Sequence, residues 1–160
     1  MQTRNISQSL ITLFRELLYG PERPGQAYML NTGDAGLLRS LDAISANGAS
    51  RTSQGGASIA AHVDHLRYGL SLMNAWSGGA NPWDTADFTA SWRISTVTDA
   101  EWQDLRLRLR NDSERWLQAM HTKRDLTDDE LNIVSGVTAH LAYHLGAIRQ
   151  IDKATRGPRA

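Results

Sequence analysis

Apolar residues recur every three or four positions in five stretches of the chain, a spacing that places them on one face of an α-helix. The first stretch covers roughly residues 4–19, and the following Gly20 and Pro21 favour a helix end there. The second stretch is shorter and is expected to end at Asn47 and Gly48. Its apolar side carries Leu37, Leu38, Leu41 and Ile44.

Capping signals place the starts of the other three helices. Ser58 is a favourable N-cap for a helix that runs to about Ser77. Two further starts carry a capping box, in which a threonine hydroxyl and a glutamate three residues later satisfy free backbone N–H groups of the first turn. The last helix is expected to cover about residues 128–154. The capping pairs are Thr98 with Glu101 and Thr127 with Glu130.

The segment at about residues 80–98 has no helical spacing and holds three large aromatic residues, Trp83, Phe88 and Trp92. Irregular loops of this length are uncommon, and they are usually functional or packed down by their own aromatic side chains. We therefore expect a lid or a rim here. Trp83 and Trp92 either pack over the end of the helices or line a substrate pocket.

The pattern as a whole predicts an all-α fold. The expected architecture is a four-helix bundle with an additional N-terminal helix and a long loop between the third and fourth helices. With 160 residues and a mass of 17.7 kDa, the chain has the size of a single domain, which we expect to span residues 1–160.

Composition removes several classes of function. Lys and Arg number 17 and Asp and Glu number 17, so no net charge draws the protein to nucleic acid or to an anionic membrane. The sequence has no signal-peptide pattern and no apolar run that approaches the roughly 20 residues of a membrane span. We expect a cytoplasmic protein. Because cysteine is absent, a metal site has to be built from His, Asp or Glu.

Two pairs of histidines lie on the third and fifth expected helices. His140 and His144 are one turn apart and share the core direction, so both imidazoles can reach one point in space. On the third helix, His62 lies about 60° and His65 about 120° from Ile59, so the spacing slightly favours His62 as the inward residue. The residues expected on the opposite, polar side are Asp64, Arg67, Ser71 and Asn74.

Inward histidines have two interpretations. Each can be a hydrogen-bonded core residue, which is the commoner case for a single histidine. Three of them on facing helices would all need partners, because an unsatisfied buried polar group costs roughly 1–3 kcal/mol. A shared cation satisfies all three together, so the pattern is equally consistent with a metal site and with a packed polar core.

The motifs SIAAHVDHL at residues 58–66 and HLAYHLGAIRQI at residues 140–151 resemble the DinB-like, YfiT-like family of metal-dependent enzymes. The resemblance covers about residues 33–151. It implies a four-helix bundle that holds a divalent metal through three histidines, which correspond here to His65, His140 and His144. His65 is selected because the matching histidine of the family directly precedes a leucine. His62 is then left as a residue that supports a ligand, contacts substrate or belongs to the core.

Three neutral imidazoles leave a divalent metal its full charge and an open position, which is typical of a catalytic zinc site. Zinc is the expected metal, with nickel or another transition metal as the alternative. The family includes thiol-dependent S-transferases and isomerases, so the resemblance implies a small-molecule substrate and a low-molecular-weight thiol or water. His62 is a weak candidate for the general base, as are Asp84 and Asp87, whereas His121 is expected at the surface.

An alternative function remains open at this stage. The chain would then be a non-catalytic bundle with a structural metal or a packed polar core, acting in binding or in a stress response. In either case we expect a homodimer, because the first helix and the outer faces of a small bundle offer more apolar surface than one core requires.

Overall fold

The computed structural model describes residues 3–122 and 126–158, and every regular element in these ranges is a helix. The all-α fold class is therefore confirmed. Two short helices and two 3-10 turns lie between the four long helices, and a third 3-10 turn follows the last of them. The long helices are α1 (Thr3–Tyr19), α4 (Ile59–Ser77), α5 (Asp99–Met120) and α6 (Asp128–Ile151). The short elements are α2 (Gly36–Asp42), α3 (Ala46–Ala49), η1 (Trp83–Thr85), η2 (Ala90–Trp92) and η3 (Lys153–Thr155).

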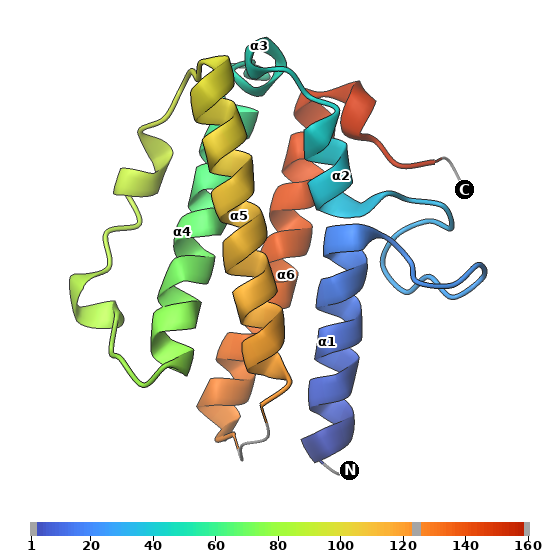
Figure 1. Ribbon diagram of the computed structural model, residues 1–160, viewed down its shortest axis with the longest axis vertical. Coiled ribbons are helices and arrows are strands. Elements are labelled where there is room, and N and C mark those ends of the chain that lie inside the picture. The colour runs from blue at the N-terminus through green and yellow to red at the C-terminus, as the bar shows by residue number, and fades with distance from the viewer. Residues whose placement is uncertain (1–2, 123–125, 159–160) are drawn as a thin grey trace.

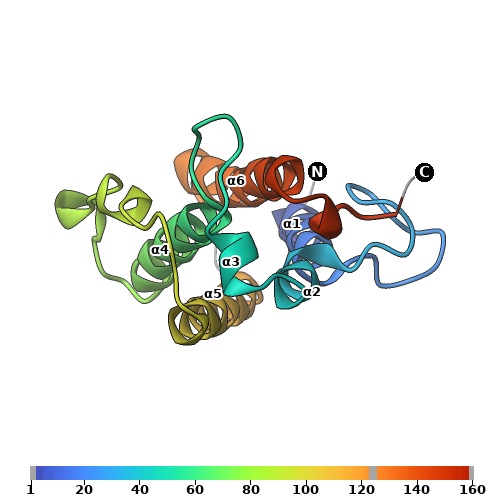
Figure 2. The ribbon, with the colours of Figure 1, turned by 90° about the horizontal axis from the view of Figure 1, so that it is seen from above.

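The four long helices lie side by side along the longest axis of the molecule (Figure 1). The end view shows them around a common centre, with α4 beside α5 and α6, and α1 beside the same two helices (Figure 2). The segment from η1 to η2 runs along the outer side of α4 (Figure 1). Thus α4 contacts protein on three sides.

All four long helices contribute side chains to one apolar core. Phe14, Val63, Leu109, Trp116 and Leu141 are among the side chains that are almost completely removed from solvent. Burial of such side chains is the main source of stability in a helical fold.

The expected caps are present at the starts of α4, α5 and α6. The Ser58 hydroxyl accepts a hydrogen bond from the Ala61 N–H group, and both threonine–glutamate pairs form complete capping boxes. At the end of α1, Gly20 has a positive φ of 85°, and a Cβ there would collide with the backbone carbonyl of Asp34. Glycine is required at this position because other residues rarely adopt that conformation.

Two helix boundaries differ from those expected. The second helix was expected to continue to Asn47 and Gly48, but α2 ends at Asp42, and residues 46–49 form the separate helix α3. Ser45 causes the break, because its hydroxyl accepts a hydrogen bond from the Gly48 N–H group and so caps a new helix. The last helix ends at Ile151 rather than near residue 154. Asp152 leaves the helical conformation, and its carboxylate binds Arg51 at 2.6 Å.

The prediction of a polar, solvent-facing side for α4 is also wrong for one residue, Asp64. Asp64 was expected to face solvent, but it is only 9% exposed and binds the Arg67 guanidinium at 2.9 Å. The prediction from helical spacing places one buried stripe on the helix, whereas α4 packs against both α5 and α6. A helix with two packed faces buries polar residues that a single-stripe analysis assigns to solvent.

Candidate metal centre

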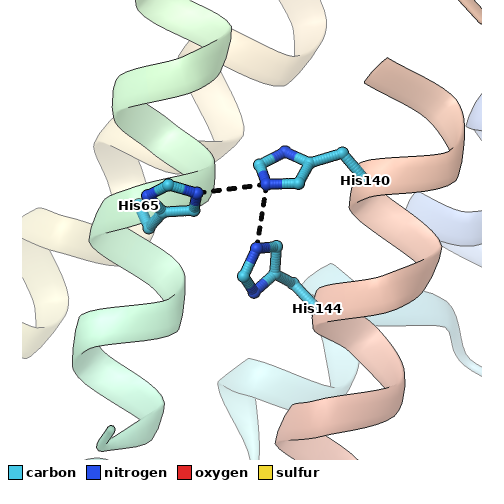
Figure 3. A group of neighbouring side chains, drawn as sticks. All are labelled: His65, His140 and His144. Carbon is cyan, nitrogen blue, oxygen red and sulfur yellow. Dashed lines mark hydrogen bonds between the residues drawn. The ribbon is translucent and has the colours of Figure 1, made fainter. Parts of the chain in front are cut away.

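Three histidine side chains meet between α4 and α6. His65 comes from α4, and His140 and His144 come from successive turns of α6 (Figure 3). The His140 Nε2 atom lies 3.1 Å from His65 Nε2 and 2.9 Å from His144 Nε2. One nitrogen of each ring lies within 4.8 Å of the other two. The structure thus brings together the three residues that the resemblance indicated.

The far side of the His65 ring is held by the loop between α4 and α5. His65 Nδ1 lies 2.9 Å from the Ser91 hydroxyl, which donates its own hydrogen to the Phe88 carbonyl at 2.8 Å. Because that hydrogen is already used, Ser91 accepts from the Nδ1–H group of His65. The Nε2 atom of the neutral ring then carries a lone pair directed at His140.

The far side of the His144 ring is held by His62. Their Nδ1 atoms lie 2.8 Å apart, and the two ring centroids are 5.1 Å apart. When His144 Nε2 acts as a ligand, its Nδ1 carries the hydrogen and donates it to His62. His62, which spacing alone slightly favoured as the inward residue, therefore contacts a member of the cluster rather than completing it.

Two of the three clustered rings are buried, and the third is half-buried. His144 is 2% and His65 8% exposed, and His140 is half-buried. Burial, followed by repulsion from the neighbouring histidines in their charged forms, lowers the pKa of His65 to about 4 and the pKa of His144 to about 3. Burial also lowers the pKa of His140 and of His62. The rings are therefore neutral near pH 7, which is the state that binds a metal.

Trp92 covers one side of the cluster. Its ring is stacked on His65 with centroids 4.3 Å apart, and it meets His62 edge-on at 5.4 Å. This stacking fixes the plane of the His65 imidazole. Trp92 does not line the neighbouring cavity, whereas Trp83 does.

The donor set fits one divalent transition-metal ion. Imidazole nitrogens bind zinc at about 2.0–2.1 Å, so ligands of one ion lie roughly 3 Å from one another. The separations of 3.1 and 2.9 Å around His140 Nε2 match that spacing. The Nδ1 contacts of His65 and His144 supply the outer support that ligating histidines usually have.

A cavity of about 340 Å³ adjoins the cluster, and His65 and His140 form part of its wall. The remaining wall is built mainly by apolar side chains of α4 and α6, with Phe14 from α1. Trp83 and Phe88 of the long loop also line the cavity and are 40% and 45% exposed, so they stand at its mouth. The loop thus forms a rim beside the histidines.

The two carboxylates considered as general bases are engaged elsewhere. Asp84 accepts a hydrogen bond from the Asn81 amide, and Asp87 accepts from the Thr89 and Ala90 N–H groups. Both are exposed, and neither is among the described residues that line the cavity. Their contacts are those of loop turns. His121 is exposed at the end of α5, as expected.

Sequence reasoning missed Ser91, whose contact with His65 spans 26 positions of the chain. A serine beside a tryptophan in a loop carries no signal that could have identified it. The cluster and its supports therefore come from α4, α6 and the intervening loop, three segments that only folding brings together. No family model matches the chain, and neither a curated protein nor a solved structure matches it.

Proposed function

We propose that this chain binds one divalent metal ion through the Nε2 atoms of His65, His140 and His144. The observation that carries the proposal is the convergence of three Nε2 atoms while the Nδ1 atoms of His65 and His144 are engaged elsewhere. The ligands thus have the orientation that coordination needs.

Hydrogen bonding alone leaves the cluster incompletely satisfied. His140 Nε2 faces two other Nε2 atoms, but a neutral imidazole nitrogen carries at most one hydrogen. If His140 donates to His65, it cannot also accept from His144. If it accepts from His144, its nitrogen faces the lone pair of His65. A cation at the centre satisfies all three nitrogens together, which favours a metal over a packed polar core.

The proposed activity is that of a DinB-like metal-dependent enzyme of the S-transferase or hydrolase type. The ring of four long helices and the order of the histidines along the chain support a bundle of that kind. When bound, the metal supplies a full positive charge and an open position, where the pKa of a water or thiol falls into the physiological range. The cavity beside His65 and His140 has room for a small-molecule substrate, which supports this proposal.

The chain contributes orientation and exclusion of water. Ser91 and His62 hold two of the ligand rings from behind, and Trp92 shields the face of His65. Zinc is the metal favoured by a site of three histidines, with nickel or another transition metal as the alternative.

Metal content tests the proposal first. Protein purified without a metal-affinity tag should contain about one zinc or other transition metal per chain by elemental analysis. Near pH 8, metal at a thousandfold excess over Kd should raise the free energy of unfolding by about 4 kcal/mol, so the metal-loaded protein should melt at a higher temperature than the chelator-treated protein. Superimposable melting curves would rule out the metal site and favour the packed polar core.

Activity separates an enzyme from a non-catalytic bundle in binding or stress response. The metal-loaded protein should accelerate attack of a low-molecular-weight thiol on a chromogenic electrophile, or hydrolysis of a chromogenic ester. The matched control is His140→Ala, which removes a ligand. A metal-loaded protein that accelerates neither reaction would instead support a structural role for the metal.

A further inference from the structure

Three glycines inside the long helices have no local explanation; two of them line a cavity, and the third, Gly146, does not. Gly69 lies in α4 and Gly136 in α6, and both have helical backbone conformations rather than a positive φ. Glycine inside a helix is destabilising relative to alanine. A Cβ atom at either position would have no neighbouring atom within 4 Å, so close helix packing does not require glycine there. Both residues line the cavity beside the histidines, and what they share is the space they leave open.

The two glycines occupy equivalent places relative to the histidines. Gly69 lies one helical turn after His65, and Gly136 lies one turn before His140. The helices α4 and α6 run in opposite directions (Figure 1). Both walls therefore lead from the histidines to the glycines and then to Met73 and Ile133. The cavity is therefore a slot with the Nε2 cluster at one end.

The wall of the slot is apolar beyond the histidines. Its other lining groups are aliphatic side chains of α4 and α6 and aromatic rings from α1 and the loop. The described residues that line it include no Asp, Glu, Lys or Arg. A charged group placed in the slot would lose its hydration without gaining an opposite charge, so the wall selects against charge.

We propose that this slot binds the uncharged, apolar part of the substrate, an aliphatic chain or an aromatic ring, with the reacting polar end at His65 and His140. The inference rests on the proposed function and adds the class of substrate to it. A volume of about 340 Å³ lies within the range of roughly 300–1,000 Å³ usual for small-molecule sites. Gly69 and Gly136 limit which molecules fit, because both line the slot and a Cβ at either position would stand in open space.

Filling the slot from either wall tests the proposal. The probe is N-phenyl-1-naphthylamine, an uncharged aromatic compound that fluoresces in apolar surroundings, titrated into chelator-treated protein. Wild type should bind it, whereas Gly69→Leu and Gly136→Leu should each weaken binding by about tenfold or more, because the new side chain takes the space of the ring. The matched control is Gly146→Leu, a position of α6 that does not line the cavity and where a Cβ also has no neighbour within 4 Å. It should bind like wild type.

Helical content by circular dichroism shows whether each variant is folded, and Gly136→Ala, which adds a single methyl group, provides a milder variant of the same test. Equal affinity in wild type and both filled variants would overturn the proposal. Absence of probe binding to wild type would also overturn it.

A second titration separates this proposal from the metal proposal. With metal-loaded protein, octanohydroxamic acid should bind about tenfold or more tightly than acetohydroxamic acid, because its chain buries apolar surface in the slot. Gly136→Leu should remove that advantage and leave acetohydroxamic acid unaffected. If no metal binds, the proposed function fails while the dye titration still decides the slot. If metal binds but chain length has no effect, only the inference about the substrate is wrong.

Discussion

The two packed sides of α4 differ: one is filled by apolar side chains, and the other holds histidines and a cavity. The side toward α5 forms the more extensive contact, and the core there includes the large buried residues Leu109 and Trp116. The side toward α6 carries buried imidazoles, two opposed glycines and a cavity. The face of α4 toward α5 therefore stabilises the fold through apolar contacts, whereas the face toward α6 has less apolar packing. Empty volume beside buried imidazoles reduces stability, and their combination on the α6-facing side marks it as a candidate functional site.

Removal of a cluster histidine should produce the largest effect. His65→Ala, His140→Ala and His144→Ala should each abolish stoichiometric metal binding, because two imidazoles hold an ion far more weakly than three. His62→Ala should keep the stoichiometry with an affinity lowered by about 10–100-fold, as expected for a residue that supports a ligand. Zinc titration against a chromophoric chelator measures both effects, and His121→Ala is the surface control. If His62→Ala abolished binding while His65→Ala retained it, the first ligand would be His62.

Matched leucine truncations should show the difference between the two faces as a difference in stability. Leu109→Ala opens a new void in a closed core and should lower the free energy of unfolding by about 3–5 kcal/mol. Leu70→Ala enlarges a cavity that already exists and should cost less, about 2–3 kcal/mol. Urea unfolding of both variants gives the comparison. Equal costs would mean that the two faces are packed alike.

Acid should destabilise the metal-free protein because the imidazoles buried between α4 and α6 have to take up protons. The pKa of His65 is lowered to about 4 and that of His144 to about 3, whereas both titrate near 6.5 in the unfolded chain. Between these values the unfolded state binds more protons, so the free energy of unfolding is unaffected above about pH 6.5 and falls as the pH drops toward 4. Urea unfolding with chelator at about pH 8 and about pH 5 measures this loss.

Two glutamine variants test the contribution of His144 to this loss. His144→Gln removes a buried titrating group and should reduce the loss of stability between the two pH values. His121→Gln removes an exposed histidine and should leave the loss as in wild type. The same loss in His144→Gln as in wild type would contradict the assignment.

Self-association should have the smallest effect on the two faces of α4, because both faces pack against helices of the same chain. We expect a homodimer, with a light-scattering mass of twice 17.7 kDa at micromolar concentration. Metal content per chain should be the same before and after dilution to monomer. A mass near 17.7 kDa at micromolar concentration would exclude the dimer, and a metal content that falls with dimer dissociation would mean that the partner contributes to the site.

Across residues 3–122 and 126–158, no helix combines the length and the apolar character that crossing a membrane requires. This agrees with the sequence, in which charged residues interrupt every apolar stretch before it reaches that length.

Local interactions made much of the fold predictable from the sequence alone. The capping boxes at Thr98 and Thr127 and the glycine at position 20 act within a few residues of the chain, so their effect on helix boundaries can be predicted without knowing the fold. The Ser45 cap is equally local, but the spacing of apolar residues, which runs to Ile44, does not reveal it. The pairing of His140 with His144 is also a local property, because residues four apart share a helix face.

Only the tertiary structure decided what lies opposite that pair. His65 and His62 are both near the inward side of α4, and the rotation of α4 between two packed neighbours brings His65 to the cluster and His62 behind His144. Ser91 reaches His65 through a loop with no periodic pattern. Gly69 and Gly136 form a slot because they face the same space from antiparallel helices. These relations depend on how whole helices pack, which the spacing of residues along one helix does not contain.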